Sequence, residues 1–384
     1  MDTCEIGGGE AVFIKATVVD MALPETGRIF AVSDIHGAGD LLKRALEQVK
    51  FGPEDTLFVL GDIVEKRAGS LETLQYVMEL KRRYRVHVLC GNCDDLVPGF
   101  LDGREELPPA FYDHYFRFFR DRSVLVEMGM SLGLTLEDCL DQPGLRAAIA
   151  EPFRAEMDFL RSLPTAIRTP EMLFVHGGVP SAQGIEELEA WRCMKNDNFL
   201  GQDNQLDRWC VVGHWPTTLY RPYIPCFNPI EDREKRVISI DGGTSIKEDG
   251  QLNLVELSRD GLVSWVGLDR LPTAVALDGQ EESVCSVNIR WGRDNLLTVL
   301  ERGEEFCRCR HLTTGREIDI LTDYIWEKDG LTRCEDSTDY RLPVTAGETL
   351  SVVRRTSRGA LVKKDGVTGW YTGRLAEPTS GLSS

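Results

Sequence analysis

The sequence predicts an α/β fold with a helical insertion, followed by a small all-β region. Short apolar runs that end in glycine or a polar cluster are typical of buried parallel strands. Segments with apolar residues at helical spacing lie between these runs, as in residues 40–49. Beyond residue 284 the chain reads as short strands separated by turns.

Three polar clusters in the first hundred residues each follow an apolar run. They are Ser33-Asp34-Ile35-His36-Gly37, Gly61-Asp62 and Gly91-Asn92-Cys93-Asp94. Polar residues just past parallel strands lie at the carboxyl edge of the sheet, where α/β folds place their sites. Such carboxylate, imidazole and amide ligands suit Mn, Fe or Zn, and one carboxylate can bridge two ions. Taken singly, an Asp after a strand is often only a helix cap.

These clusters, together with the later stretches FVHGGVP and VVGHWP, resemble the motifs of calcineurin-like metallophosphoesterases. The narrower resemblance is to phosphoprotein phosphatases, including the bacterial diadenosine tetraphosphatases. The gapless run through residues 70–73 supports this narrower match. The resemblance covers residues 28–257 and implies a four-layer α/β/β/α sandwich with a helical cap.

The resemblance also implies two divalent metal ions, with Mn as the first choice and Fe or Zn as alternatives. The implied ligands are Asp34, His36 and Asp62 for one ion, and Asp62, Asn92, His176 and His214 for the other. Hydrolysis would then proceed by in-line attack of a metal-bridging hydroxide on a phosphate ester. We expect Asp241, which follows a later strand, to support His214 as a hydrogen-bond acceptor.

The chain departs from the family pattern at the group that protonates the leaving alkoxide. The family has a His where this chain has Cys93, and an Asp where it has Glu65, so the Asp–His dyad becomes Glu–Cys. We assign catalytic roles to Cys93, Glu65 and the neighbouring Asp94. Three interpretations of Cys93 stay open: a weak general acid, a bystander while Glu65 reaches the leaving group, or a redox pair with Cys90. Losing a general acid slows hydrolysis roughly a hundred- to ten-thousandfold.

The phosphate-binding Arg of the same family motif is also replaced. Lys66 occupies its position, and Arg67 follows where the family has Gly. Lysine is a point charge without the bidentate fork of arginine. Asn92 and Arg192 complete the predicted phosphate-binding set, and Arg208 is a weaker candidate.

Composition limits the partners and the compartment. The 384 residues carry a formal net charge of −18, which argues against nucleic acid or an anionic membrane as a partner. Eleven cysteines without a regular spacing fit reduced thiols in a cytoplasm. We expect no signal peptide and no membrane helix.

The predicted organisation has four parts. They are a tail and edge strand at 1–27, the metallophosphoesterase domain at 28–267 with its cap at 98–164, a linker at 268–283, and a β-rich region at 284–384. Within the last part, residues 335–377 resemble bacterial SH3-like domains, with a hairpin turn at Asp365-Gly366 and an aromatic pair at Trp370-Tyr371. This module is predicted to bind a peptide or protein.

The leading functional prediction is a phosphatase acting on phosphoserine or phosphothreonine in proteins. A nucleotide, such as a dinucleoside polyphosphate, is the alternative substrate, and arginines of the cap are expected to select it. A different class also stays open, in which the protein binds phosphorylated ligands as a sensor and has lost most of its catalysis at Cys93.

Overall fold

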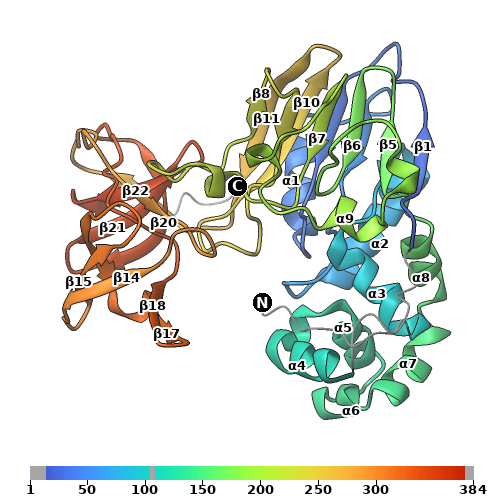
Figure 1. Cartoon of the computed structure of the whole chain (residues 1–384), viewed down its shortest axis with the longest axis horizontal. Coiled ribbons are helices and arrows are strands. Elements are labelled where there is room, and N and C mark those ends of the chain that lie inside the picture. The colour runs from blue at the N-terminus through green and yellow to red at the C-terminus, as the bar shows by residue number, and fades with distance from the viewer. Residues whose placement is uncertain (1–13, 104–108, 377–384) are drawn as a thin grey trace, which may run out of the picture.

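The computed structural model describes residues 14–103 and 109–376 (Figure 1). The tail predicted at residues 1–10 lies outside the described residues. Two sheets form the centre of the N-terminal two thirds, as the sequence predicts. No helix in the described part of the chain combines the length and the apolar character needed to cross a membrane.

The first sheet has six strands in the order β1-β5-β6-β7-β9-β8. Their bounds are β1 (Val18–Asp20), β5 (Ala166–Arg168), β6 (Met172–Val175), β7 (Trp209–Val212), β9 (Val237–Ser239) and β8 (Ile230–Asp232). The second sheet has five strands in the order β11-β10-β2-β3-β4. Their bounds are β11 (Gly261–Leu268), β10 (Leu252–Ser258), β2 (Ile29–Val32), β3 (Thr56–Val59) and β4 (Arg85–Val88).

The two sheets pack face to face. Phe58 of β3 and Phe174 of β6 stack with ring centroids 3.8 Å apart, and both side chains are fully buried. Alternate residues of the central strands point into the space between the two sheets and form an apolar core there. Removing this apolar surface from water stabilises the packing of the sheets. The strands β9 and β10 belong to different sheets, because β9 pairs with β7 whereas β10 pairs with β2.

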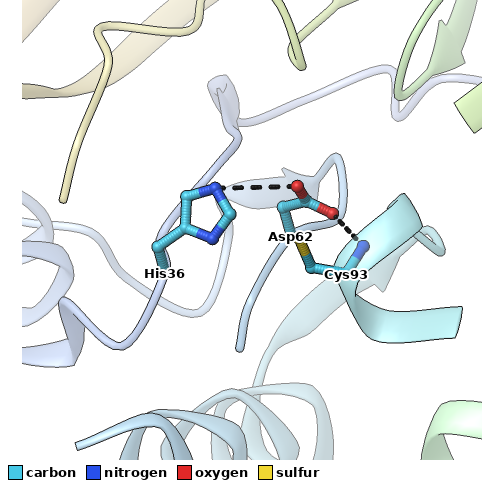
Figure 2. Close-up of side chains that lie close together, drawn as sticks. All are labelled: His36, Asp62 and Cys93. Atoms are coloured by element: carbon cyan, nitrogen blue, oxygen red, sulfur yellow. Dashed lines mark hydrogen bonds and ion pairs between the residues drawn. The ribbon is translucent and has the colours of Figure 1, made fainter. Parts of the chain in front are cut away.

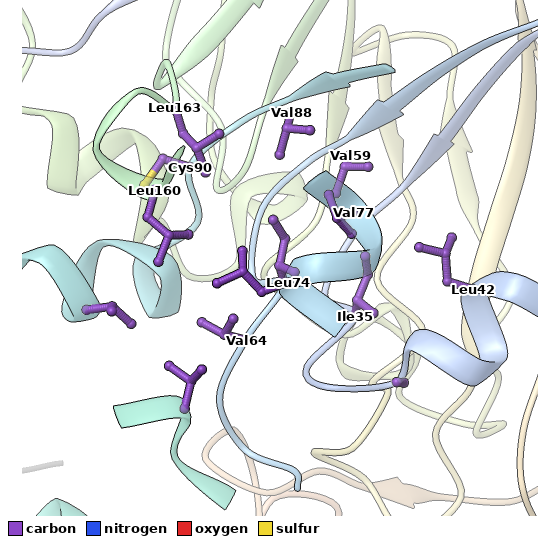
Figure 3. Close-up of a cluster of buried hydrophobic side chains, with 14 of the residues drawn as sticks. Ile35, Leu42, Val59, Val64, Leu74, Val77, Val88, Cys90, Leu160 and Leu163 are labelled. Atoms are coloured by element: carbon purple, nitrogen blue, oxygen red, sulfur yellow. The ribbon is translucent and has the colours of Figure 1, made fainter. Parts of the chain in front are cut away.

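Helices cover the outer faces and complete the four layers. The second sheet is covered by α1 (Gly39–Gln48), α2 (Ser70–Arg83) and α3 (Asn92–Asp102). Figure 3 shows part of this core, with Leu42 of α1 and Leu74 and Val77 of α2 beside Val59 and Val88 of the sheet. The first sheet is covered more sparsely, by α9 (Ala190–Met194) and two 3₁₀ helices, η2 (Ile185–Glu187) and η3 (Phe199–Gly201).

The helical cap follows α3, as predicted. Its elements are α4 (Pro109–Phe119), η1 (Arg120–Arg122), α5 (Val124–Ser131), α6 (Leu136–Leu140), α7 (Gln142–Ala150) and α8 (Arg154–Arg161). The single helix expected over 136–149 is two helices. Asp141 ends α6 and begins α7, because Pro143 is accommodated only in the first turn of a helix.

The C-terminal region contains several small sheets. The largest has the order β22-β21-β20-β12-β23. Its strands are β22 (Val367–Tyr371), β21 (Gly359–Lys364), β20 (Thr349–Thr356), β12 (Thr273–Ala276) and β23 (Leu375–Ala376). The other strands are β13 (Asn288–Ile289) with β19 (Ser337–Thr338), β14 (Leu297–Glu301) with β15 (Phe306–His311) and β16 (Glu317–Leu321), and β17 (Ile325–Lys328) with β18 (Leu331–Cys334).

Two sequence predictions concern this region. The hairpin turn at Asp365-Gly366 is present between β21 and β22, with φ of 50° and 77°. The predicted linker 268–283, however, contains β12, which pairs with β20 and β23 and so belongs to the C-terminal sheet. This strand has only four residues and lies between turn-forming residues, so the sequence pattern predicted a loop there.

Candidate metal centre

The residues predicted as metal ligands all lie just past the carboxyl ends of strands. They are Asp34 and His36 after β2, Asp62 after β3, Asn92 after β4, His176 after β6 and His214 after β7. The strands come from both sheets, yet the loops meet. The backbone N–H of His214 donates to Asp34 Oδ2 over 2.9 Å, which joins a first-sheet loop to a second-sheet loop.

Four of these residues have a backbone conformation that non-glycine residues seldom adopt. Their positive φ angles are 50° at Asp34, 46° at His36, 52° at Asp62 and 65° at His214. The left-handed conformation costs an L-residue about 1–3 kcal/mol and persists at functional sites where the surroundings enforce it. Glycine makes the close approach possible, since a Cβ at Gly213 would lie 2.4 Å from Asp34 Oδ2.

The carboxylate of Asp62 lies between two imidazoles. Its Oδ2 is 3.6 Å from His36 Nε2, and its Oδ1 is 3.5 Å from His176 Nε2. Figure 2 shows the His36 side of this arrangement. Each oxygen of one carboxylate therefore faces a different histidine, which is the geometry of a ligand shared by two ions.

Backbone carbonyls fix the tautomers of these two histidines. His36 Nδ1 lies 3.1 Å from the carbonyl of Val64, and His176 Nδ1 lies 2.7 Å from that of Leu60. A carbonyl only accepts, so both rings carry hydrogen on Nδ1 and present Nε2 as a ligand atom. Hydrogen bonding of this kind orients metal-binding histidines.

His214 is oriented by a carboxylate that the sequence analysis missed. Its Nε2 lies 2.8 Å from Asp197 Oδ1, and Lys195 Nζ donates to the same oxygen over 2.7 Å. The carboxylate accepts from Nε2, which leaves Nδ1 as the ligand nitrogen. The expectation that Asp241 supports His214 is therefore wrong, since Asp241 Oδ1 accepts from the N–H of Gly243 instead. No periodicity or motif marks Asp197, which lies in a polar loop after α9.

The donor set fits a pair of divalent cations. Among the predicted ligands, four acceptor atoms are buried without a hydrogen-bond partner in the described part of the chain: Asp34 Oδ1, His36 Nε2, Asn92 Oδ1 and His176 Nε2. Ligand atoms of Asp62, His176 and His214 lie within 4.8 Å of one another, as do those of His36, Asp62 and Cys93. Buried acceptors left unpaired are unfavourable unless a cation or proton satisfies them.

The charges in the centre favour a cation as well. Burial alone would lower the pKa of His176, but the carboxylates of Asp62 and Asp34 outweigh it and raise that pKa to about 10. The pKa of Asp62 itself lies below its ordinary value despite burial, because His176 and His36 stabilise its charge. Without a metal, the site therefore holds a proton where a metal cation would satisfy the same carboxylates.

Asp94 holds the Asp62 loop in place. Its buried carboxylate accepts from the backbone N–H groups of Asp62 (2.7 Å), Ile63 (2.9 Å) and Gly91 (2.9 Å). Burial, followed by the charge of Asp62, raises its pKa to about 7. These contacts do not support the predicted catalytic role, since both carboxylate oxygens are bonded to backbone.

Cys93 is buried at the centre with its thiol protonated. Its backbone N–H donates to Asp62 Oδ1 over 2.8 Å, and its Sγ accepts from Asn92 Nδ2 over 3.4 Å. Burial and the charge of Asp62 raise the pKa of the thiol well above its usual value. Cys90 belongs to the hydrophobic core that covers the second sheet, as a buried residue near the end of a strand would.

Glu65 does not form a dyad with Cys93. Its Oε2 accepts from the hydroxyl of Tyr115 over 2.8 Å, and its Oε1 accepts from the N–H of Val124 (2.8 Å) and the hydroxyl of Ser123 (3.1 Å). All three partners belong to the cap. Burial raises the pKa of Glu65 to about 7. The predicted Glu–Cys pair is therefore corrected, and Glu65 instead attaches the cap to the Asp62 loop.

The predicted phosphate-binding cations occupy different surroundings. The ammonium group of Lys66 lies 4.5 Å from the ring centroid of Phe119 and 5.5 Å from that of Tyr115. Burial lowers the pKa of His36 and the nearby charge of Lys66 lowers it further, so Lys66 lies beside the centre. Arg67 is exposed.

Arginines farther along the chain lie outside the centre. Arg192 is 78% exposed and pairs with Glu189 at 3.4 Å, and Arg208 pairs with Asp207. In the cap, Arg117 pairs with Asp113, and Arg122 donates to the carbonyls of α4. The expectation that cap arginines face the site is not supported by these contacts, and Lys66 is the predicted phosphate-binding cation that the structure brings to the centre.

Comparison with known proteins identifies the family. The sequence profile of calcineurin-like phosphoesterases matches residues 27–237, more than half of the chain. The chain belongs to this family. Symmetrical bis(5'-nucleosyl)-tetraphosphatases from Cronobacter sakazakii and Salmonella arizonae are each 42% identical to this calcineurin-like protein over 66 residues. Those matches cover 17% of the chain and 23% of each relative.

Solved structures align with about two thirds of this chain. A serine/threonine phosphatase from Saccharomyces cerevisiae aligns with a TM-score of 0.41 and 11% identity, over 67% of this chain and 86% of the other. A metallophosphoesterase from Sphaerobacter thermophilus aligns with a TM-score of 0.35 and 16% identity, over 64% of this chain and 89% of the other.

Proposed function

We propose that this calcineurin-like protein hydrolyses phosphate esters with two divalent metal ions that share Asp62. The observation that carries the proposal is the position of that carboxylate, with His36 on one oxygen and His176 on the other. The first ion is assigned to Asp34, His36 and Asp62. The second is assigned to Asp62, Asn92, His176 and His214.

The two ions supply the main chemistry when they are bound, by lowering the pKa of a water molecule and polarising the phosphoryl oxygens. The protein contributes positioning. Backbone carbonyls and Asp197 orient the histidines, and Asp94 holds the Asp62 loop. Lys66 binds the phosphate as a point charge, held in place by Phe119 and Tyr115.

Protonation of the leaving group is the weak step in this site. Glu65 is engaged by the cap and Asp94 by the backbone, so the thiol of Cys93 is the remaining proton donor of the predicted catalytic set. With a pKa well above the usual value, it is a poor acid at neutral pH. The site therefore suits esters whose leaving groups need little protonation.

Phosphoserine and phosphothreonine in proteins are the substrate class that the sequence favours, although their alkoxide leaving groups depend most on a general acid. A dinucleoside polyphosphate is the second candidate, and two observations favour it. The curated relatives are named as tetraphosphatases. A nucleotide leaving group is also less basic than a serine alkoxide, so a poor general acid slows its release less.

The test measures hydrolysis of p-nitrophenyl phosphate, a phosphoserine peptide and diadenosine tetraphosphate with Mn, Fe or Zn added. Activity on p-nitrophenyl phosphate that is lost in Asp62→Asn supports the two-metal phosphoesterase. The ranking of the other two substrates decides the class. Two bound ions per chain without hydrolysis of any substrate would contradict the enzyme and favour the alternative, in which the protein binds phosphorylated ligands as a sensor.

A further inference from the structure

The C-terminal β region packs against the segment that directly follows His214. This segment comprises the 3₁₀ helix η4 (Thr217–Tyr220) and residues 221–228. In Figure 1 the yellow-green chain after β7 leaves the sandwich and runs to the orange and red β region. We call residues 217–228 the strap.

One end of the strap is held by β13. Asn288 donates its Nδ2 to the carbonyl of Arg221 over 2.8 Å and to that of Thr218 over 3.3 Å. Its backbone N–H donates to the carbonyl of Pro222 over 2.9 Å. Just past β13, Arg290 donates from Nη1 to the carbonyl of Leu219 over 2.9 Å. The C-terminal region therefore satisfies the carbonyl of Leu219 at the end of this short helix and the carbonyls of the two residues that follow it.

The other end of the strap lies along β22. Thr368 donates its N–H to the carbonyl of Pro225 over 3.0 Å, and the N–H of Phe227 donates to the carbonyl of Gly366 over 2.8 Å. On the opposite side of the strap, Asn253 of β10 in the second sheet donates to the carbonyl of Phe227 over 2.7 Å. The strap is thus bonded on one side to the sandwich and on the other to the C-terminal region.

Buried charge reinforces this contact. The side chain of Lys363 is 2% exposed and forms a 3.2 Å ion pair with Asp269. Its ammonium group also donates to the carbonyl of Asp249 over 2.9 Å and lies 5.2 Å from the ring centroid of Phe227. A buried lysine that is paired and hydrogen-bonded in this way belongs to a permanent interface rather than to a module that detaches.

The aromatic pair predicted to bind a partner is used internally. Tyr371 is fully buried, and its hydroxyl donates to the carbonyl of Asp278 over 2.7 Å. Trp370 donates its Nε1 to the carbonyl of Thr338 over 2.7 Å. These contacts stabilise the C-terminal sheet itself, so they do not support a peptide-binding role for the pair.

The strap is coupled to the metal centre at its first residue. The N–H of Thr217 donates to the carbonyl of Asp241 over 2.9 Å, and the N–H of His214 donates to Asp34 Oδ2 over 2.9 Å. Only Trp215 and Pro216 separate these two anchor points. Because the two residues between them leave little freedom, a shift of η4 is expected to move the backbone of His214 as well.

We propose that the C-terminal β region is a positioning element of the metal centre, in which Asn288 and Arg290 fix the strap and thereby His214. The proposal rests on the proposed function, because it assigns His214 to the second ion. Asn288 and Arg290 are positioning residues, since their contacts are with the carbonyls of the strap.

The test compares Asn288→Ala with Asn295→Ala in the full chain. Asn295 is a matched control, since its buried Nδ2 also donates to a backbone carbonyl, that of Cys334, but within the C-terminal region. Mn affinity is measured by titration calorimetry, and amide hydrogen exchange is followed over 214–222. We expect Asn288→Ala to weaken one of two Mn sites about tenfold, because its side-chain hydrogen bonds to the strap are lost, and to speed exchange in that stretch. Asn295→Ala should change neither.

Arg290→Ala provides a second variant at the contact, in case Asn288→Ala does not fold. It should give the same pattern with a smaller effect. Wild-type Mn affinity and wild-type exchange in both strap variants would overturn the proposal, as would equal changes in Asn295→Ala. If the wild type binds no Mn, the proposed function fails, and the exchange of 214–222 still decides whether the C-terminal region holds the strap.

Discussion

The hydroxyl of Tyr115 in the cap donates to the carboxylate of Glu65 in the Asp62 loop over 2.8 Å. Ser123 and Val124 donate to the other oxygen of the same carboxylate. One buried side chain therefore joins the catalytic loop to the cap, in a position where the family pattern suggested a partner for the general acid.

This contact makes stability depend on pH in a defined direction. Burial raises the pKa of Glu65 from 4.5 to about 7. Between these values the unfolded chain has lost the proton and the folded chain retains it, so stability falls as pH rises through this window. The full effect is on the order of 3 kcal/mol, at 1.36 kcal/mol for each pKa unit. Urea unfolding of wild type and Glu65→Gln at pH 5 and pH 8 measures it.

The Gln variant should lose less stability than wild type between the two pH values. Glu137→Gln, an exposed change in the same cap, serves as the control and should follow wild type. Parallel pH curves for wild type and Glu65→Gln would show that Glu65 is ionised in both states and that its three donors outweigh burial.

Lys66 should govern substrate binding. Lys66→Met removes the cation that lies beside the centre, and we expect KM for p-nitrophenyl phosphate to rise about tenfold, the weight of one charged hydrogen bond. Arg67→Met changes the adjacent, exposed cation and should leave KM unchanged. A larger effect from Arg67 than from Lys66 would contradict the assignment.

Cys93 should limit reactions with poor leaving groups. Cys93→His introduces an acid whose pKa lies near neutrality, and we expect hydrolysis of a phosphoserine peptide to rise by up to about a hundredfold. Hydrolysis of p-nitrophenyl phosphate should change little, because its leaving group needs little protonation. Equal changes with both substrates would indicate that Cys93 acts on binding instead.

Asp197 should tune the affinity for one ion. Asp197→Ala removes the acceptor that orients His214, and loss of such a partner typically weakens metal binding about ten- to a hundredfold. Asp207→Ala, which removes an exposed carboxylate paired with Arg208, is the control. Titration with Mn should show one weakened site in the first variant and two unchanged sites in the second.

The sequence predicted which side chains gather at the candidate metal centre, because each of them follows a strand in a recognisable motif. It failed at Glu65, because Glu65 and Lys66 both have a φ of 72° and the direction of the chain there depends on the folded cap. Asp197 had no signal, because its contact with His214 arises only when a loop folds back over 17 positions. The sequence likewise did not indicate the strap, since its partners in the C-terminal region lie 63 or more positions later in the chain.

The central claim is that two ions share Asp62. Its most direct test is the Mn content per chain after equilibrium dialysis of wild type, Asp62→Asn and His36→Ala. The account predicts about two ions in the wild type, about one in His36→Ala, and less than one in Asp62→Asn, because the shared ligand serves both sites. Equal losses in His36→Ala and Asp62→Asn, or a wild type that holds a single ion, would contradict it.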